Sequence, residues 1–502
     1  MNLRIKALDD ILATAERRSL HRSLGGIHLM MLGIGAIIGT GIFVLTAEAA
    51  QKAGPGMMWS FVIAGFVCGV TALCYAELAS MVPVSGSAYT YSYAVLGEAI
   101  AWVVGWALIL EYAVAASAVS VGWSNYFVGE VGRLLHLTLP VAFTKGYFAA
   151  SGGFINVPAM FIALLCTTLL VLGTRESATF NAVLVAIKIL ALTMFIALAI
   201  PVLNEHNFRP MAPLGMNGIA GAAASIFFAY VGFDAVSTAA EETRNPQRNI
   251  PIGLIGSLLV CTAFYLLVAA GAIGAVGAQP VFGAGGEVLE PGSRALAEAC
   301  ALPIHQNALA CSDEALAFVL HHIGWTQAAN LIGLAAFLAL PSVILVMLFG
   351  QTRLFFSMSR DGLLPSLLCR VHSRFKTPHV VTMITGGFVT AAAAFFPVGA
   401  LADVSNSGTL FAFLIVSLGV MILRRRDPSR RRSFRVPVVA IVGPLAAIGC
   451  VYLFWHLPIF TKRVFFGWGA FGLVIYAFYS YPRSAMAGKG PLAGSAAGEL
   501  RR

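Results

Sequence analysis

The chain has 502 residues, of which 59% are apolar and 11% charged, with a formal net charge of +10 and a mean hydropathy of +0.84. Soluble domains carry about a quarter charged residues, because a folded surface must be hydrated. The composition therefore excludes a soluble enzyme, a disordered chain and a small disulfide scaffold, and it predicts an integral membrane protein with many spans.

A helix needs about 20 mainly apolar residues to cross about 30 Å of hydrocarbon. Apolar runs of this kind, separated by polar or Gly/Pro turns, predict about twelve transmembrane helices and therefore an all-α membrane protein. The first six runs lie near residues 26–50, 57–82, 98–122, 157–173, 178–201 and 217–239. The second six lie near residues 251–276, 327–357, 379–396, 402–423, 436–455 and 465–481.

The distribution of basic residues predicts how these spans are oriented. Of the 32 lysines and arginines, 24 lie in the termini, in the loops after even-numbered spans or at the adjoining span ends, and 7 lie in the other loops. Cytoplasmic loops are enriched in Lys and Arg, so we expect a multi-pass protein of the cell inner (plasma) membrane with both termini in the cytoplasm. The Arg424–Arg426 and Arg430–Arg432 runs are then explained by topology, and no nucleic-acid partner is expected.

The eight cysteines do not have the spacing of a metal site, and no metal or other cofactor is expected. Five of them fall in predicted spans, where cysteine behaves as a small buried side chain: Cys68, Cys74, Cys166, Cys261 and Cys450. Cys300 and Cys311 share the long predicted external loop of residues 277–326. An oxidising compartment permits a structural disulfide there, but two free thiols fit the sequence equally well.

The first span contains four glycines within Gly33–Gly41, at the expected depth of the bilayer centre. Each glycine weakens a helix by about 1 kcal/mol relative to alanine. Close packing between helices also selects small residues, so these glycines fit either a packed helix or a broken one. A break would expose the amide hydrogens of the outer half-helix, which favour a carboxylate.

The sixth span contains the segment Ser225–Asp234, in which only Gly232 indicates a break. Spans 1 and 6 are corresponding members of two five-span halves. Interruptions at matching places in two such halves indicate the binding site of a transporter. If this helix is broken, one of the aromatic residues at 227, 228, 230 and 233 is available to close over a substrate.

Two ionisable residues are predicted near the bilayer centre, Glu111 in span 3 and Lys188 in span 5. A charge at this depth costs about 2.5–3.5 kcal/mol on insertion scales, so both are expected to face a protein or water interior. A static Lys188–Glu111 ion pair is one interpretation, and a lysine that gains and loses a proton during a transport cycle is the other. The remaining acids near span ends are expected to be caps or gate contacts: Glu48, Glu77, Asp234 and Asp403.

Four stretches of the sequence carry a family resemblance: GAIIGTGIF (35–43), PVSGSAYTY (83–91), FFAYVGFDAVSTAAEE (227–242) and GQTRLFFSMSRDGLLP (350–365). In this order, and within a twelve-span layout, they resemble the amino acid–polyamine–organocation superfamily. Within that superfamily they are most similar to the bacterial relatives of the cationic amino acid transporters. The resemblance covers about residues 20–480.

This resemblance implies a LeuT-type fold, in which five spans and the next five form an inverted repeat. Residues 1–25 are then a cytoplasmic N-terminal segment, and residues 26–201 are the first transmembrane repeat. The second repeat covers residues 217–423 and includes the external loop 277–326. Residues 436–481 form two peripheral spans, and residues 482–502 form a cytoplasmic tail.

The resemblance also implies a substrate site built from the main chain of the two interrupted spans. In the family, the substrate carboxylate meets amides of span 1, which correspond here to Ile38, Gly39, Thr40 and Gly41. The substrate ammonium meets carbonyl groups, which correspond here to Ile37, Phe228, Ala229 and Val231. Phe228 corresponds to an aromatic gate, and Tyr230 belongs to the same binding segment.

Proton coupling is the second property that the resemblance implies. Lys188 falls where proton-coupled members carry a lysine in place of a second sodium site, and Glu111 fits an acid that similar proteins carry on span 3.

The sequence thus predicts a secondary transporter for L-amino acids, working as a proton-coupled symporter by alternating access. Span 8 offers no carboxylate around residues 337–345 to pair with a cationic side chain, which favours small neutral amino acids such as alanine. The alternatives are an amino acid exchanger, or an arginine or lysine transporter without proton coupling. A channel is disfavoured because Glu111 and Lys188 are too few to form rings of charge.

An enzyme is disfavoured because no nucleophile–base pair or metal cluster is expected at mid-depth. The expected partners are an L-amino acid, a proton and the lipid bilayer. Whether a small single-span membrane subunit accompanies the chain is left open.

Overall fold

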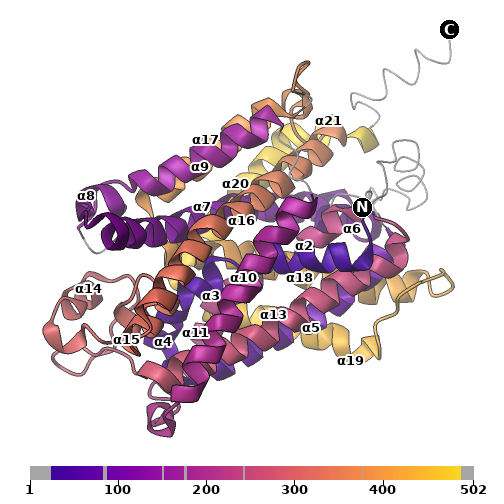
Figure 1. The fold of residues 1–502 in the computed structure, drawn as a ribbon. Coiled ribbons are helices and arrows are strands. Elements are labelled where there is room, and N and C mark those ends of the chain that lie inside the picture. Colours follow the sequence, from indigo (N-terminus) through magenta and orange to yellow (C-terminus); the bar gives the residue numbers. More distant parts are fainter. Residues whose placement is uncertain are drawn as a thin grey trace, which may run out of the picture.

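The computed structural model describes residues 24–82, 87–149, 152–173, 178–240, 243–375 and 377–487. In these ranges the regular elements are helices, accompanied by three isolated β-bridges. The helices lie side by side in one bundle around a shared apolar core (Figure 1), so the predicted all-α membrane fold is confirmed. Most of the predicted terminal segments 1–25 and 482–502, and parts of two quoted stretches (83–86 and 241–242), lie outside the described residues.

The first six predicted spans correspond to helices at nearly the expected places. The first consists of α2 (Gly26–Ile37), α3 (Thr40–Phe43) and α4 (Leu45–Ala53). The next four are α5 (Met57–Met81), α7 (Glu98–Leu135), α9 (Val157–Leu172) and α10 (Ala178–Ala199). The sixth consists of α11 (Gly215–Ile226), a short 3₁₀ helix at Phe227–Tyr230, and α12 (Ala235–Thr238).

The second six spans are continuous helices. They are α13 (Pro246–Val276), α16 (Thr326–Arg360), α17 (His379–Phe395), α18 (Val398–Arg426), α19 (Val439–His456) and α20 (Ile459–Ile475). By length and composition, eight described helical stretches are suited to cross a membrane, and three shorter apolar helices accompany them: Gly26–Ile37, Val157–Leu172 and His379–Phe395. This set agrees with the predicted layout of about twelve spans.

The helix of span 3 runs on to Leu135, well past the predicted end at residue 122. The apolar run ends there because Ser124, Asn125 and Glu130 follow, but the protein buries all three side chains. Since α7 packs against α9, α16, α17 and α18, it is the central helix of the bundle rather than a lipid-facing one. Its most apolar stretch is 83% buried, against 22% for α19, which therefore lies at the periphery.

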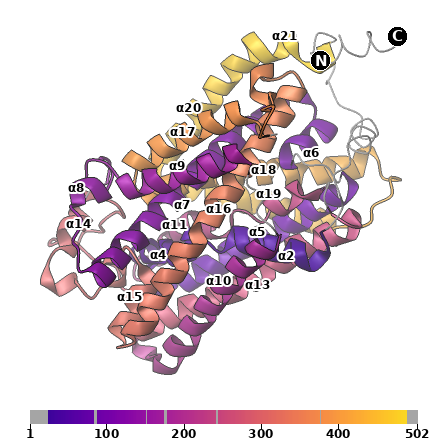
Figure 2. The same cartoon turned by 45° about the horizontal axis from the view of Figure 1, so that its top comes forward.

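The bundle has two ends that differ in their loops (Figures 1 and 2). One end carries α14 (Arg294–Cys300) and α15 (Ala315–His322), and we call it the loop face. There Cys300 and Cys311 form a disulfide, with their Cα atoms 5.5 Å apart. The other end carries α6 (Ser87–Val95), a helix that the sequence did not predict, and α21 (Tyr481–Arg483). We call it the arginine face, because Arg424–Arg426 reach it and Arg426 donates to the Val95 carbonyl there.

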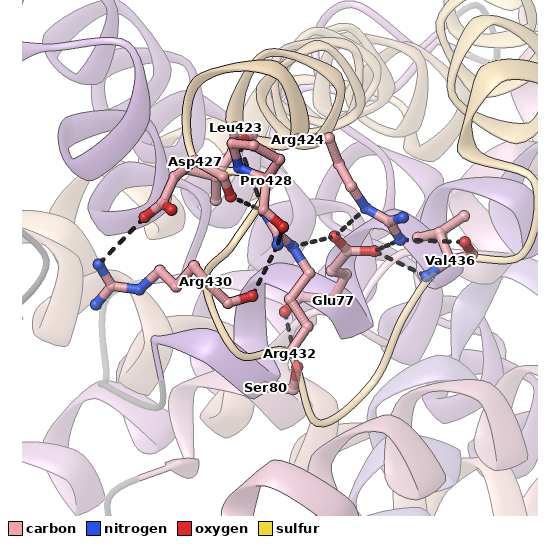
Figure 3. A network of polar contacts seen from close by, with 9 residues as sticks. All are labelled: Glu77, Ser80, Leu423, Arg424, Asp427, Pro428, Arg430, Arg432 and Val436. Atoms are coloured by element: carbon pink, nitrogen blue, oxygen red, sulfur yellow. Dashed lines mark hydrogen bonds and ion pairs between the residues drawn. The ribbon is translucent and has the colours of Figure 1, made fainter.

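A buried glutamate organises the arginine face (Figure 3). Glu77, at the end of α5, is 1% exposed and accepts two hydrogen bonds from Arg424, at 2.8 and 2.6 Å. Arg432 lies 3.2 Å from the same carboxylate, and the Val436 amide donates to it at 2.7 Å. Part of the arginine-rich loop is therefore a structural clamp that joins span 2 to span 10, in addition to any role in topology.

Removing the charge at Glu77 should destabilise the protein, since Arg432 is almost fully buried beside it. Breaking a buried ion pair from one side costs about 3–5 kcal/mol, so we expect Glu77→Gln to lower the unfolding temperature in detergent clearly. Asp427→Asn is the matched control, because its pair with Arg430 is 3.8 Å long and partly exposed, which is worth less than about 1 kcal/mol. Equal shifts for the two variants would contradict this account.

Candidate functional site

The first span is interrupted in the middle of the bundle. Helix α2 ends at Ile37, and the Ile38 amide makes its last helical hydrogen bond, to the Ile34 carbonyl at 2.9 Å. Ile38 then adopts an extended conformation with ψ 97°, and α3 begins at Thr40 after an extended Gly39. The glycine-rich segment is therefore a break, as one of the two interpretations of the sequence required.

The sixth span is interrupted as well. Helix α11 ends at Ile226, the chain continues as a 3₁₀ helix over Phe227–Tyr230, and α12 begins only at Ala235. Between them Gly232 has a φ of +110°, a conformation that residues with a Cβ rarely adopt. The single glycine that indicated a break in the sequence is thus the residue that permits it.

The two interruptions touch each other through their main chains. A Cβ on Gly41 would overlap the main chain of Ala229, and a Cβ on Gly232 would lie 3.0 Å from the Ala36 carbonyl oxygen. Gly41 is therefore needed for packing, and Gly232 for both packing and conformation. The glycines of span 1 therefore serve both a helix break and close helix packing, which the sequence left as alternatives.

Tyr265 of α13 joins the two interruptions. Its hydroxyl lies 2.9 Å from the Ile37 carbonyl oxygen and 2.8 Å from the Ala229 carbonyl oxygen. Both carbonyls were predicted to be free for a substrate ammonium, and this expectation needs correction because the protein already supplies a donor. A hydroxyl has one proton and a carbonyl oxygen has two lone pairs, so each carbonyl still has room for a second donor.

The remaining predicted acceptors differ in their availability. The Phe228 carbonyl accepts a hydrogen bond from the Val231 amide at 3.2 Å, so it too has an internal partner. The Tyr230 hydroxyl donates to the Phe61 carbonyl of α5 at 3.0 Å, so this side chain anchors the break to span 2 rather than facing span 1. Phe228, the predicted aromatic gate, is buried like the rest of the segment 227–231, and its gate role stays a prediction.

One of the four predicted donors needs correction, and the other three stay a prediction. The Ile38 amide is used by the end of α2, so it does not belong to the donor set. The amides of Thr40 and Gly41 are in the first turn of α3, where a helix has no internal acceptors for its N–H groups. The Thr40 hydroxyl is fully buried and has no hydrogen-bond partner among the described residues. An unsatisfied hydroxyl beside unsatisfied amides is suited to an anionic ligand group.

Lys188 lies against the first break from the side of span 5. Its side chain is 0% exposed, and the amine donates to the Gly35 carbonyl at 2.8 Å and to the Ser342 hydroxyl at 3.3 Å. Lys188 therefore connects α10 to α2 and α16.

Glu111 belongs to a different set of contacts. Its carboxylate is fully buried beside Asp234 and Thr409, and the Tyr112 hydroxyl donates to Asp234 at 2.8 Å. The described contacts of Glu111 therefore do not include the Lys188 ion pair that one interpretation of the sequence required.

A polar cluster closes the site on the loop face. Lys52 of α4 pairs with Glu48 at 2.7 Å and with Asp403 of α18 at 3.5 Å, and it also contacts the Ser225 hydroxyl of α11. Ser225 donates to Asp403 at 2.6 Å. The cluster joins the parts of spans 1, 6 and 10 that lie at the loop face.

Two apolar side chains of α16 lie beside the two breaks. A Cβ on Gly39 would lie 3.5 Å from Val343, and the Met347 side chain lies beside Gly232. The part of the chain that the structure describes contains no cluster of three or more His, Cys, Asp or Glu side chains arranged for a metal ion. The site is thus a main-chain cradle with an apolar wall.

Tyr265 is the site residue that the sequence analysis missed. It is one of three hydroxyl side chains in a 31-residue, mainly apolar helix, and hydropathy does not reveal which face of such a helix meets a break. The available signal was a lone tyrosine at mid-depth, which needs a buried hydrogen-bond partner.

Comparisons with known proteins agree with this architecture. The family model for amino acid permeases matches residues 24–479. The chain is 44% identical over 486 residues to the branched-chain amino acid permease BcaP of Bacillus subtilis (strain 168), covering 96% of this chain and 98% of that protein. It is 40% identical over 484 residues to the methylthioribose transporter of the same organism, with the same coverage of 96% and 98%.

A plant relative is more distant. The chain is 35% identical over 441 residues to the vacuolar cationic amino acid transporter 2 of Arabidopsis thaliana, covering 86% of this chain and 64% of that protein. By their names, all three relatives are transporters.

The contact between the two breaks can be tested with a single methyl group. Gly41→Ala should force α3 away from Ala229, and overpacking of this kind costs about 1–3 kcal/mol, so we expect a roughly 5- to 150-fold loss of substrate affinity. Gly221→Ala is the control, because its Cβ would point into open space on α11. Transport assays that find the two variants equally active would contradict the main-chain contact.

Proposed function

This chain belongs to the amino acid permease family and is a multi-pass membrane transporter of amino acids, and we propose that it is a proton-coupled symporter of neutral L-amino acids. The observation that carries the proposal is the pair of helix interruptions in contact at Gly41 and Ala229. Together they offer donors for a carboxylate on one side and acceptors for an ammonium on the other.

Recognition of the amino acid backbone is proposed to use the main chain. The amides of Gly39, Thr40 and Gly41, with the Thr40 hydroxyl, would bind the carboxylate, because the start of a helix favours negative charge. The carbonyls of Ile37 and Ala229 would bind the ammonium through the lone pairs that Tyr265 leaves unused. Such a site accepts any L-amino acid, so the side chain must be selected elsewhere.

Selection of a neutral side chain is supported by the apolar wall at Val343 and Met347. Burying a guanidinium or ammonium group against this apolar wall would be unfavourable. Small neutral amino acids such as alanine are the first substrates to test. Branched-chain amino acids are the second, because a relative with 44% identity is named for them.

Proton coupling is proposed to act through Lys188. A protonated amine makes charge-assisted hydrogen bonds, which are stronger than neutral ones, so the charged form holds Gly35 of α2 against Ser342 of α16. Loss of the proton would weaken this connection and let the inner half of span 1 move. Glu111, buried beside Asp234, is proposed as a second proton-carrying group.

Alternating access is proposed to use the two faces as gates. The Lys52 cluster closes the loop face, which the charge distribution assigns to the exterior of the plasma membrane, with both termini in the cytoplasm. Residues 26–201 and 217–423 are proposed as the two inverted repeats that carry the gates, and residues 436–481 as peripheral spans.

Proteoliposomes with an imposed pH gradient test this function most directly. We expect empty liposomes that contain the protein to accumulate labelled alanine, leucine or both, and we expect accumulation to collapse when the gradient is dissipated. An obligate exchanger would accumulate nothing until unlabelled amino acid is loaded inside. Competition by arginine or by methylthioribose stronger than that by alanine and leucine would show that the assigned substrate class is wrong.

Replacing Lys188 should separate transport from the proton gradient. We expect Lys188→Met to lose most of the difference in uptake between liposomes with and without a gradient, because methionine has no amine to bind and release a proton. Lys462→Met, at a half-buried position where the amine contacts the carbonyl and the ring of Trp455, should keep that difference. If uptake by the Lys188→Met protein still depends fully on the pH gradient, Lys188 does not take part in proton coupling.

A further inference from the structure

The long loop between α13 and α16 is bound to the outer half of span 1 through one side chain. Gln51 of α4 is 1% exposed, and its amide nitrogen donates to the carbonyls of Val281 and Leu289 at 2.8 and 2.9 Å. Its amide oxygen accepts from the Val281 N–H at 2.8 Å. Three buried hydrogen bonds to the loop main chain make this a firm attachment.

The same loop is bound to span 3 through an acid near its other end. Glu314 receives a hydrogen bond from Arg133 of α7 at 2.8 Å, and Arg133 also bonds Glu130 at 2.8 Å. The Glu314 carboxylate sits directly on Gly129, where a Cβ would overlap it. Glycine at this position thus provides the niche into which the loop inserts its acid.

Further contacts make the loop one connected piece. Asp313, next to Glu314, pairs with Lys145 of the segment after α7 at 2.7 Å. The disulfide between Cys300 and Cys311 lies between the part of the loop that binds Gln51 and the part that enters the niche. The loop therefore bridges the outer half of span 1 and the outer end of span 3.

We propose that the loop of residues 277–325 is a latch of the loop-face gate, in which Gln51 couples the loop to α4 and Glu314 positions it in the Gly129 niche on α7. This inference rests on the proposed alternating-access function. It assigns Gln51 and Glu314 as positioning residues that act through α4, outside the substrate site itself.

The two attachments differ in how easily they open. The bonds of Gln51 are buried and involve the main chain, whereas the Arg133 side chain is 30% exposed. The Glu314 side chain is 15% exposed, so water reaches the Arg133–Glu314 pair more easily than it reaches the bonds of Gln51. When α4 moves to open the loop face, the loop follows it through Gln51, and the contacts of Glu314 with Arg133 and of Asp313 with Lys145 separate.

A methyl group in the niche tests the latch. Gly129→Ala should displace Glu314, whereas Gly132→Ala, on the same helix, places its Cβ where the nearest atom, the Leu137 carbonyl oxygen, is 4.0 Å away. Both changes raise helix propensity equally, so a difference in hydrogen exchange between the two variants reports the contact of Glu314 with the niche. We expect hydrogen exchange in residues 45–53 and 281–289 to become about tenfold faster in Gly129→Ala only, as for a loss of about 1.4 kcal/mol of closing free energy.

The outcomes of this experiment separate the two proposals. Equal exchange in both variants, or faster exchange in the loop without a change in residues 45–53, would overturn the latch. Absence of amino acid uptake by the wild-type protein would instead refute the proposed function, and the exchange data would still report whether loop and helix open together.

A covalent latch provides a second test. The pair Gly129→Cys and Glu314→Cys should crosslink under mild oxidation and block uptake by more than tenfold, with recovery on reduction. Wild-type protein treated in the same way controls for reduction of the native Cys300–Cys311 bond. A crosslinked protein that transports normally would contradict the proposal.

The pH dependence of the latch has a definite sign. Burial, outweighing the attraction of Arg133, raises the pKa of Glu314 to about 7. The charged and titratable groups around it are Arg133, Glu130 and Tyr126 of α7 and its neighbour Asp313. The pKa of Glu314 is higher in the closed niche than in water, so protonation of Glu314 favours the closed latch. Closure is therefore strongest at acidic pH and weakens as the pH rises toward 7.

We therefore expect exchange in residues 45–53, corrected for the intrinsic pH effect, to increase from pH 5 to pH 8 in the wild type. Glu314→Gln removes the titrating group and should remove this increase. The same pH dependence in both proteins would show that Glu314 does not control the latch.

Discussion

The contact between the two helix interruptions is the constraint on which the rest of the structure depends. Non-helical backbone at membrane depth is tolerated only when the protein or a bound ligand satisfies its polar groups. Here Gly41 lets span 1 lie on Ala229 of span 6, and Tyr265 supplies one hydroxyl to a carbonyl of each span. The acceptors are only partly satisfied, and the first amides of α3 have no internal acceptors, which is the basis of the proposal that the two breaks bind a zwitterion.

Charged side chains are arranged around this contact at three levels. On the loop face, Lys52 and Asp403 join the outer parts of spans 1 and 10. At the centre, Lys188 joins spans 1, 5 and 8 through a carbonyl and a hydroxyl. On the arginine face, Glu77 joins spans 2 and 10 through two arginines. Each group connects helices that the proposed alternating-access cycle would move relative to each other or hold together.

The sequence predicted the helices and the interruptions better than the partners of individual side chains. Four glycines in nine residues weaken the helix of span 1 through local propensity alone. Composition thus allowed a break there, and the family resemblance favoured it. The contacts of Lys188, Glu111 and Tyr265 depend instead on the rotation of each helix about its axis, which packing sets and an apolar sequence hardly encodes. For the same reason α7 runs past its predicted end: Asn125 and Glu130 are polar in sequence but buried by neighbouring helices.

Thermal stabilisation of the purified protein by matched ligands tests the central claim most directly. A ligand that binds only the native state raises the unfolding temperature by mass action. The comparison uses L-alanine or L-leucine, the corresponding amine without a carboxylate, and the corresponding carboxylic acid without an amine. The account predicts that the amino acid stabilises the protein and that neither half does so at the same concentration. Equal stabilisation by the amine or the acid alone would contradict a site that holds both ends of the substrate between the two breaks.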